Sequence, residues 1–161
     1  MHLLEFALKM ELDGEKYYME QAEKFKDTNL HIVFKALARD ERKHADIIRF
    51  RMDRVAPDLL DSDALDQYRN VFQGAGDFKS AIKFTLDQLD IYYLALEKEQ
   101  ESIDLYKKML SEAANYYDQR TFQFLIKEEE SHLEILDDIV SHVSKARDWV
   151  EDAEFGIREE Y

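Results

Sequence analysis

A Glu-x-x-His motif occurs twice in this 161-residue chain, at residues 41–44 and 129–132, and the two copies are 88 positions apart. The same separation relates Glu11 to Glu99. In an α-helix, residues three positions apart lie on one face about a turn from each other, so each motif can direct a carboxylate and an imidazole at one point. Two such helices and two further glutamates predict a site for two metal ions.

Each motif lies on the inward-facing stripe of its predicted helix. Phe34 and Leu37 precede the first motif in steps of three and four, and Ile48 follows it. These are core positions of a helical bundle. Four unpaired carboxylate charges in an apolar core would cost more than the net stability of a domain, roughly 5–15 kcal/mol, whereas two divalent cations would neutralise them. The predicted metal ligands are Glu11, Glu41, His44, Glu99, Glu129 and His132.

The amphipathic pattern predicts four long helices, over about residues 3–26, 30–55, 85–114 and 116–145. Pro57 stops the second helix, and Thr85 with Gln88 resembles a capping box at the start of the third. Short turns make two antiparallel hairpins, and the segment between them is long enough to cross the bundle. We therefore expect an all-α domain over residues 1–145, a four-helix bundle with a crossover at about 56–84.

Three further expectations concern the remaining segments and the surface. Residues 61–72 are expected to form a short helix within the crossover, followed by a flexible break at residues 74–76. The tail, residues 146–161, has two alternatives: a short fifth helix packed on the bundle, or one packed on a second subunit. Aromatic residues expected on the exterior predict a homodimer: Tyr92, Tyr93, Tyr116 and Tyr117.

Charge and composition exclude several classes of function. A net charge of −14 without basic patches argues against nucleic acid or an anionic membrane as partner. No apolar run approaches the length of a membrane span, and the N-terminus lacks the features of a signal peptide, so we expect a cytoplasmic protein. The absence of cysteine excludes disulfides, thiolate zinc sites and cysteine-liganded iron. Electrons for any redox reaction must therefore come from another molecule.

A tyrosine follows each unpaired glutamate by seven residues, giving Tyr18 after Glu11 and Tyr106 after Glu99. These tyrosines either hydrogen-bond ligand carboxylates across the bundle or fill the core as ordinary aromatic residues. With the two Glu-x-x-His motifs, the pattern covers nearly the whole chain and resembles the ferritin-like superfamily, most closely its rubrerythrin-type branch. The family's rubredoxin-type domain, which needs cysteine, is missing.

The resemblance implies a pair of iron ions as cofactor, with manganese as the alternative suited to carboxylate and imidazole ligands. It implies outer ligands at Glu11 and Glu99 and bridging ligands at Glu41 and Glu129, with one terminal histidine on each ion, His44 and His132. Rubrerythrins reduce hydrogen peroxide, and related ferritins oxidise ferrous iron. We therefore expect a di-iron oxidoreductase of oxidative stress that uses hydrogen peroxide or oxygen and an external electron-donor protein. The alternatives are a ferroxidase or iron-handling protein, and a metal-stabilised bundle without catalysis.

The chain departs from rubrerythrins at one position near the predicted site. Those proteins carry an additional glutamate one turn beyond the first ligand of the third helix, where this chain has Ser102. The counterpart in the first helix is Gly14. The small residues would leave room for an oxidant, and Glu15 is the candidate for a replacement carboxylate.

Overall fold

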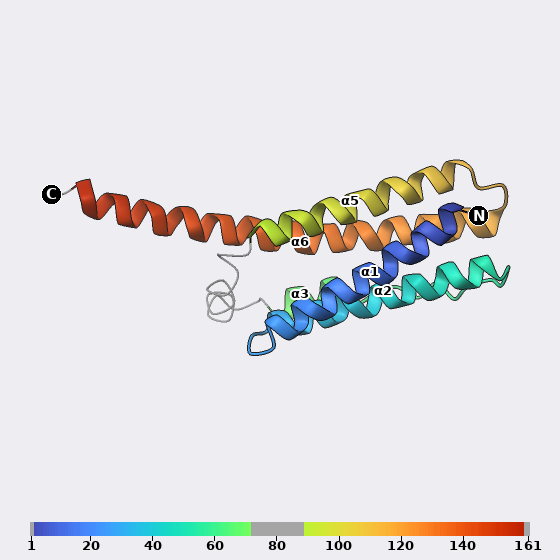
Figure 1. The fold of residues 1–161 in the computed structure, drawn as a ribbon, viewed down its shortest axis with the longest axis horizontal. Coiled ribbons are helices and arrows are strands. Elements are labelled where there is room, and N and C mark those ends of the chain that lie inside the picture. The colour runs from blue at the N-terminus through green and yellow to red at the C-terminus, as the bar shows by residue number, and fades with distance from the viewer. Residues whose placement is uncertain (1, 72–88, 160–161) are drawn as a thin grey trace.

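The computed structural model describes residues 2–71 and 89–159. Two antiparallel helix pairs, α1 with α2 and α5 with α6, form the bundle (Figure 1). The first pair comprises α1 (His2–Lys24) and α2 (Leu30–Met52), and the second comprises α5 (Leu89–Ser111) and α6 (Tyr116–Glu159). The prediction of an all-α, ferritin-like four-helix bundle is confirmed.

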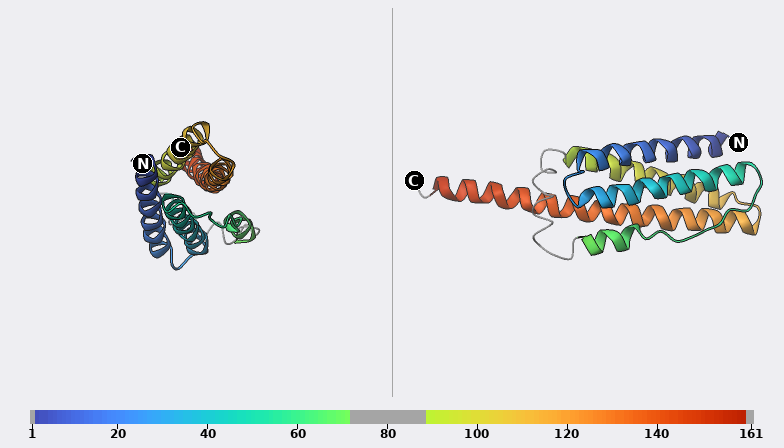
Figure 2. Two further views of the ribbon diagram at one scale, coloured as in Figure 1. Left: turned by 90° about the vertical axis from the view of Figure 1, so that its right-hand side faces the viewer. Right: turned by 90° about the horizontal axis from the view of Figure 1, so that it is seen from below.

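After α2, residues 53–71 run back along the outside of the bundle (Figure 2). They include the short helix α3 (Ala64–Val71), which packs against α2 and α6. This helix agrees with the expectation for residues 61–72. The predicted break at residues 74–76 and the predicted capping box at Thr85 lie outside the described residues.

Two apolar clusters fill the bundle interior. One contains Phe25 and Phe34 with Leu136, and the other contains Ile48 with Leu125. Between these clusters lie buried acidic and imidazole side chains from α1, α2, α5 and α6. The positions predicted to form the core are buried, so the heptad frame of both motifs holds in the structure.

The structure corrects three details of the sequence analysis. Helix α2 ends at Met52 rather than Val55, because Arg54 adopts a left-handed conformation with φ of 59° before Pro57 is reached. The tail forms no separate fifth helix: α6 continues without interruption to Glu159 and projects beyond the other helices (Figure 1). Tyr92, expected on the exterior, is 1% exposed and packs against Phe25 and Phe34.

Candidate metal centre

The six predicted ligands, although far apart in the sequence, meet in the middle of the bundle. Each of the six residues is at most 5% exposed. They form two groups whose potential ligand atoms lie within 4.8 Å of one another. Both groups contain Glu41 and Glu129. One adds Glu11 and His44, and the other adds Glu99 and His132.

Each histidine directs Nδ1 at the carboxylates. Nδ1 of His44 lies 3.1 Å from Oε1 of Glu129 and 3.4 Å from Oε2 of Glu11. Nδ1 of His132 lies 2.9 Å from Oε1 of Glu41. The two rings face each other at a centroid distance of 5.6 Å. The 88-residue repeat of the sequence is therefore a local twofold arrangement in space.

Two acidic residues that the sequence analysis missed contact the opposite nitrogen of each ring. Oδ2 of Asp40 lies 2.9 Å from Nε2 of His132, and Oε1 of Glu128 lies 3.7 Å from Nε2 of His44. Both acids are buried, and each comes from the helix opposite its histidine. The Asp40 contact is a hydrogen bond that keeps the proton on Nε2 of His132 and leaves Nδ1 for a metal ion, whereas Nε2 of His44 makes no hydrogen bond among the described residues. Asp40 and Glu128 are also 88 positions apart, but a search for identical residues passes over an Asp and a Glu.

The two buried tyrosines bind the outer glutamates in a crossed arrangement. The Tyr18 hydroxyl on α1 donates to Oε1 of Glu99 on α5. The Tyr106 hydroxyl on α5 donates to Oε1 of Glu11 on α1. Burial and the nearby carboxylates raise the pKa of both tyrosines well above the ordinary value, so both hydroxyls keep their protons. The hydrogen bonds join the two helix pairs where α1 and α5 face each other.

The outer glutamates and the histidines favour each other's charged forms. Burial disfavours the charged form of Glu11, but the neighbouring His44 holds the pKa of this carboxyl at about 2. Burial likewise opposes charge on Glu99, yet hydrogen bonds and the positive charge of His132 lower its pKa. Burial also opposes charge on the imidazoles, but the surrounding carboxylates raise the pKa of both histidines well above the ordinary value.

The pKa values of Glu41 and Glu129, which belong to both groups, are raised rather than lowered. Burial, together with repulsion from Glu11, Glu129 and Glu99, raises the pKa of Glu41 well above the ordinary value. Burial and repulsion from Glu11 and Glu99 raise the pKa of Glu129 in the same way. Protons on Glu41, Glu129 and the two histidines therefore neutralise the buried carboxylate charge, as bound cations would.

The donor set fits divalent metal ions. Several inward-facing atoms make no well-aligned hydrogen bond among the described residues: Oε2 of Glu11, Oε2 of Glu129, and the pair formed by Oε1 of Glu41 and Nδ1 of His132, which lie 2.9 Å apart. Buried polar atoms without partners are costly, and here they converge on the two groups of potential ligands. Carboxylate oxygens with imidazole nitrogens suit iron and manganese. The two groups are therefore compatible with two metal ions that share Glu41 and Glu129.

Comparison with protein families bears on this centre. The model of the family described as rubrerythrin matches residues 2–140. The chain belongs to the rubrerythrin family. The matched range contains all six predicted ligands and both tyrosines. Neither the curated proteins nor the solved structures gave a match to this chain.

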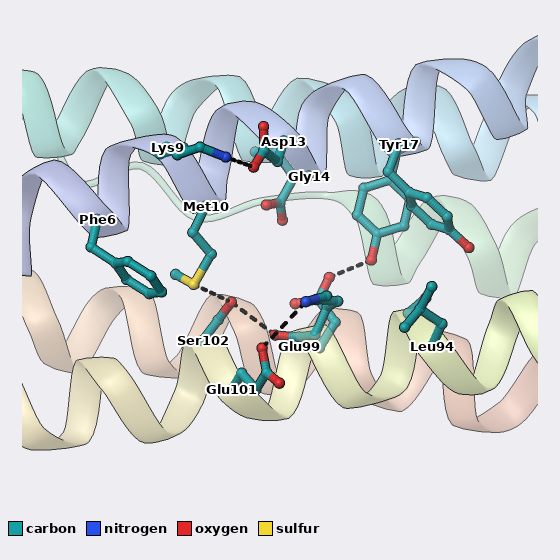
Figure 3. A pocket seen from close by; sticks show the side chains of 14 residues that line it. Phe6, Lys9, Met10, Asp13, Gly14, Tyr17, Leu94, Glu99, Glu101 and Ser102 are labelled. Carbon is teal, nitrogen blue, oxygen red and sulfur yellow. Dashed lines mark hydrogen bonds and ion pairs between the residues drawn. The ribbon is translucent and has the colours of Figure 1, made fainter.

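A cavity of about 360 Å³ between α1 and α5 reaches the centre of this rubrerythrin-family bundle (Figure 3). Glu41 and Glu99 lie among its lining residues. Apolar side chains contribute most of the remaining wall: Phe6, Met10, Tyr17, Leu94 and Ala95. Exposed ion pairs lie at the rim, where Lys9 is 2.7 Å from Asp13 and Lys98 is 3.6 Å from Glu101.

Ser102, where this chain departs from rubrerythrins, and Gly14, its counterpart in α1, both line the cavity. Gly14 and Ser102 are related by the repeat, and the Ser102 hydroxyl lies 3.3 Å from Sδ of Met10. Glu15 is absent from both groups of potential ligands. Its side chain is 28% exposed and lies 3.7 Å from the Arg42 guanidinium, so Glu15 does not replace the missing carboxylate in this structure.

No helix among the described residues is long and apolar enough to cross a membrane.

Proposed function

We propose that this member of the rubrerythrin family is a di-iron oxidoreductase that reduces hydrogen peroxide, or reacts with oxygen, with electrons from an external donor. The observation that supports the proposal is the cavity that joins the surface of the bundle to Glu41 and Glu99. A centre that only stabilised the fold would need no such access.

The two groups of potential ligands assign each proposed ligand to one ion or to both. Glu11 and His44 would hold one ion, and Glu99 and His132 the other. Glu41 and Glu129, which belong to both groups, would bridge them. When bound, two ferrous ions supply the two electrons that convert hydrogen peroxide and two protons into two molecules of water.

Other side chains prepare the ligands for this role. Tyr18 and Tyr106 donate to one oxygen of each outer glutamate, which leaves the second oxygen for a metal ion. Asp40 fixes the ring of His132 from behind through a hydrogen bond, and Glu128 lies 3.7 Å behind the ring of His44. The mostly apolar cavity wall suits a small neutral molecule, and the rim lysines Lys9 and Lys98 are each paired with an acid.

The electron donor is proposed to be a separate protein, because the chain has no cysteine for an iron centre of its own. We also propose a homodimer. Large exposed aromatic residues support it, namely Phe6, Tyr93, Tyr116 and Tyr117, which are 50–68% exposed. Light scattering coupled to size-exclusion chromatography will show whether the protein in solution has the mass of one chain or two.

The test of the function is anaerobic loading of the apoprotein with Fe(II), followed by rapid mixing with hydrogen peroxide or with oxygen. We expect two irons per chain and faster oxidation by peroxide. Steady consumption of peroxide with a chemical reductant would then establish turnover. Stoichiometric binding without any reaction would contradict the proposal and favour the metal-stabilised bundle.

Iron handling is the second candidate, and the net charge of −14, which attracts cations, favours it. In that case oxygen would oxidise the loaded protein faster than peroxide. Uptake would continue beyond two irons per chain. The same loading experiment therefore separates the two candidates.

A further inference from the structure

Ser62, in the crossover two residues before α3, contacts both acids that lie behind the histidines. Its hydroxyl donates to Oδ2 of Asp40, and its backbone N–H donates to Oε2 of Glu128 at 3.4 Å. The hydroxyl oxygen also accepts a hydrogen bond from the N–H of Ala64 at 3.0 Å, at the first residue of α3. The start of α3 is thereby joined to α2 and to α6.

Asp40 and Glu128 link Ser62 to the two histidines of the centre. Oδ2 of Asp40 accepts from Ser62 and also lies 2.9 Å from Nε2 of His132. Glu128 presents one oxygen to Ser62 and the other, at 3.7 Å, to Nε2 of His44. One residue outside the four long helices therefore lies behind both imidazoles.

We propose that Ser62 is a positioning residue that sets the metal affinity of the centre from the crossover. Its hydroxyl fixes the carboxylate that accepts from Nε2 of His132, and its amide holds the carboxylate that lies 3.7 Å from Nε2 of His44. An imidazole whose Nε2–H is held by a fixed acceptor keeps Nδ1 aimed at the ion and makes it a stronger donor. The crossover is then part of the metal site as well as a connection between hairpins.

The hydroxyl and the amide make separable contributions. Replacing Ser62 with alanine removes the donor to Asp40 but leaves the backbone N–H that serves Glu128. The substitution should therefore weaken one of the two ions selectively. Loss of an interaction behind a ligand typically lowers metal affinity about 10–100-fold.

The test is titration of the apoprotein with Co(II), followed by the visible absorption of the bound ion. In Ser62→Ala we expect one Co(II) to bind about tenfold more weakly or worse, and the other to stay within about threefold of wild type. Ser62→Gly, which also lacks the hydroxyl, should show the same loss. Ser62→Thr keeps a hydroxyl and should restore the affinity. Circular dichroism will verify the helical content of each variant.

Two controls separate positioning from docking of the crossover. The Tyr68 hydroxyl on α3 donates to Asp138 on α6, away from the centre, so Tyr68→Phe disturbs the docking of α3 without touching Asp40 or Glu128. It should bind Co(II) like wild type. In the Asp40→Ala background, Ser62→Ala should have no further effect, because the carboxylate through which the hydroxyl acts is gone.

Unchanged affinity in both variants that lack the hydroxyl would overturn the inference. An equal loss in Tyr68→Phe, or a loss from Ser62→Ala that persists without Asp40, would also overturn it. The inference rests on the metal site of the proposed function and not on its reaction. If wild type binds two Co(II) ions and the iron-loaded protein ignores peroxide and oxygen, the proposed function fails while the role of Ser62 stands.

Discussion

A Cβ atom placed on Gly14 would lie 2.5 Å from Oε2 of Glu41 and 3.2 Å from its Cδ. Real Cβ atoms do not come that close to a neighbour, so any larger residue in this turn of α1 must displace the Glu41 carboxylate. Glycine inside a helix is otherwise unfavourable by about 1 kcal/mol relative to alanine. Gly14 is therefore explained by the position of a proposed bridging ligand.

Gly14→Ala should have opposite effects on the apoprotein and on metal binding. The helix gains up to about 1 kcal/mol from alanine, so the apoprotein should unfold at the same or a higher temperature. The shifted Glu41 should weaken the binding of both ions, since it belongs to both groups. Thermal unfolding without metal and Co(II) titration measure the two effects. Ser102→Ala, at the related position, is the matched control, and equal affinity in the two variants would refute the prediction.

Removal of a tyrosine hydroxyl should affect one half of the centre. Tyr18→Phe leaves an oxygen of buried Glu99 without its donor, which should lower the free energy of unfolding by about 1–3 kcal/mol. It should also weaken the ion held by Glu99 more than the other. Denaturant unfolding and Co(II) titration test this result. Tyr93→Phe, at a half-exposed position on α5, is the control, and a similar change there would count against the assignment.

Single alanine substitutions should divide the ligands into two classes. Glu41→Ala and Glu129→Ala should impair both ions, because each residue belongs to both groups, whereas Glu11→Ala should impair one. Metal content after equilibrium dialysis gives the stoichiometry. Glu15→Ala removes an acid four residues from Glu11, about one helical turn away, and should keep two ions per chain. Loss of both ions from Glu11→Ala would show that the ligands are not shared in this way.

Stability of the apoprotein should fall as the pH rises from about 5 to about 8. Glu41 and Glu129, with an ordinary pKa of 4.5, and the two buried histidines, with an ordinary pKa of 6.5, all have raised pKa values in the fold. The folded chain therefore keeps protons that the unfolded chain releases, and stability declines with pH. Glu11, with its pKa at about 2, acts in the opposite direction but only at lower pH.

Metal binding must displace these protons, so affinity should rise over the same interval in which the apoprotein weakens. Calorimetric titration in two buffers of different ionisation enthalpy counts the protons released. Thermal unfolding across the pH range, with and without Zn(II), tests the opposite slopes. A Glu41→Gln, Glu129→Gln double variant should flatten the part of the apoprotein slope that these two carboxyls cause. A wild-type slope that does not depend on these residues would contradict the prediction.

The sequence predicts this fold well because the helices are long and their core positions are regular. Both motifs interrupt apolar stripes at the same heptad positions, and an identical offset relates the glutamates and histidines that meet in the structure. Asp40 and Glu128 were within reach of the same reasoning. They share the offset and lie on inward-facing positions, but similarity of charge rather than identity was needed to recognise them.

Other features could not be obtained in this way. Ser62 lies in an irregular segment, where no periodicity indicates which way a side chain points. Tyr92 and Tyr93 are adjacent tyrosines that look alike in sequence, and only the bundle shows that Tyr93 alone faces solvent. No glycine or proline interrupts residues 116–155, and α6 accordingly runs through the tail without a break.

The contacts that the two tyrosines and Asp40 make with the ligands cross between the two halves of the chain. Tyr18 of the first half binds Glu99 of the second, Tyr106 binds Glu11, and Asp40 lies against His132. Neither hairpin alone could complete its own set of supporting groups. This is the pattern expected if an ancestral hairpin first worked as a symmetric pair of separate chains and the gene was later duplicated and fused. The crossover would then be the connection added when the two hairpins were fused.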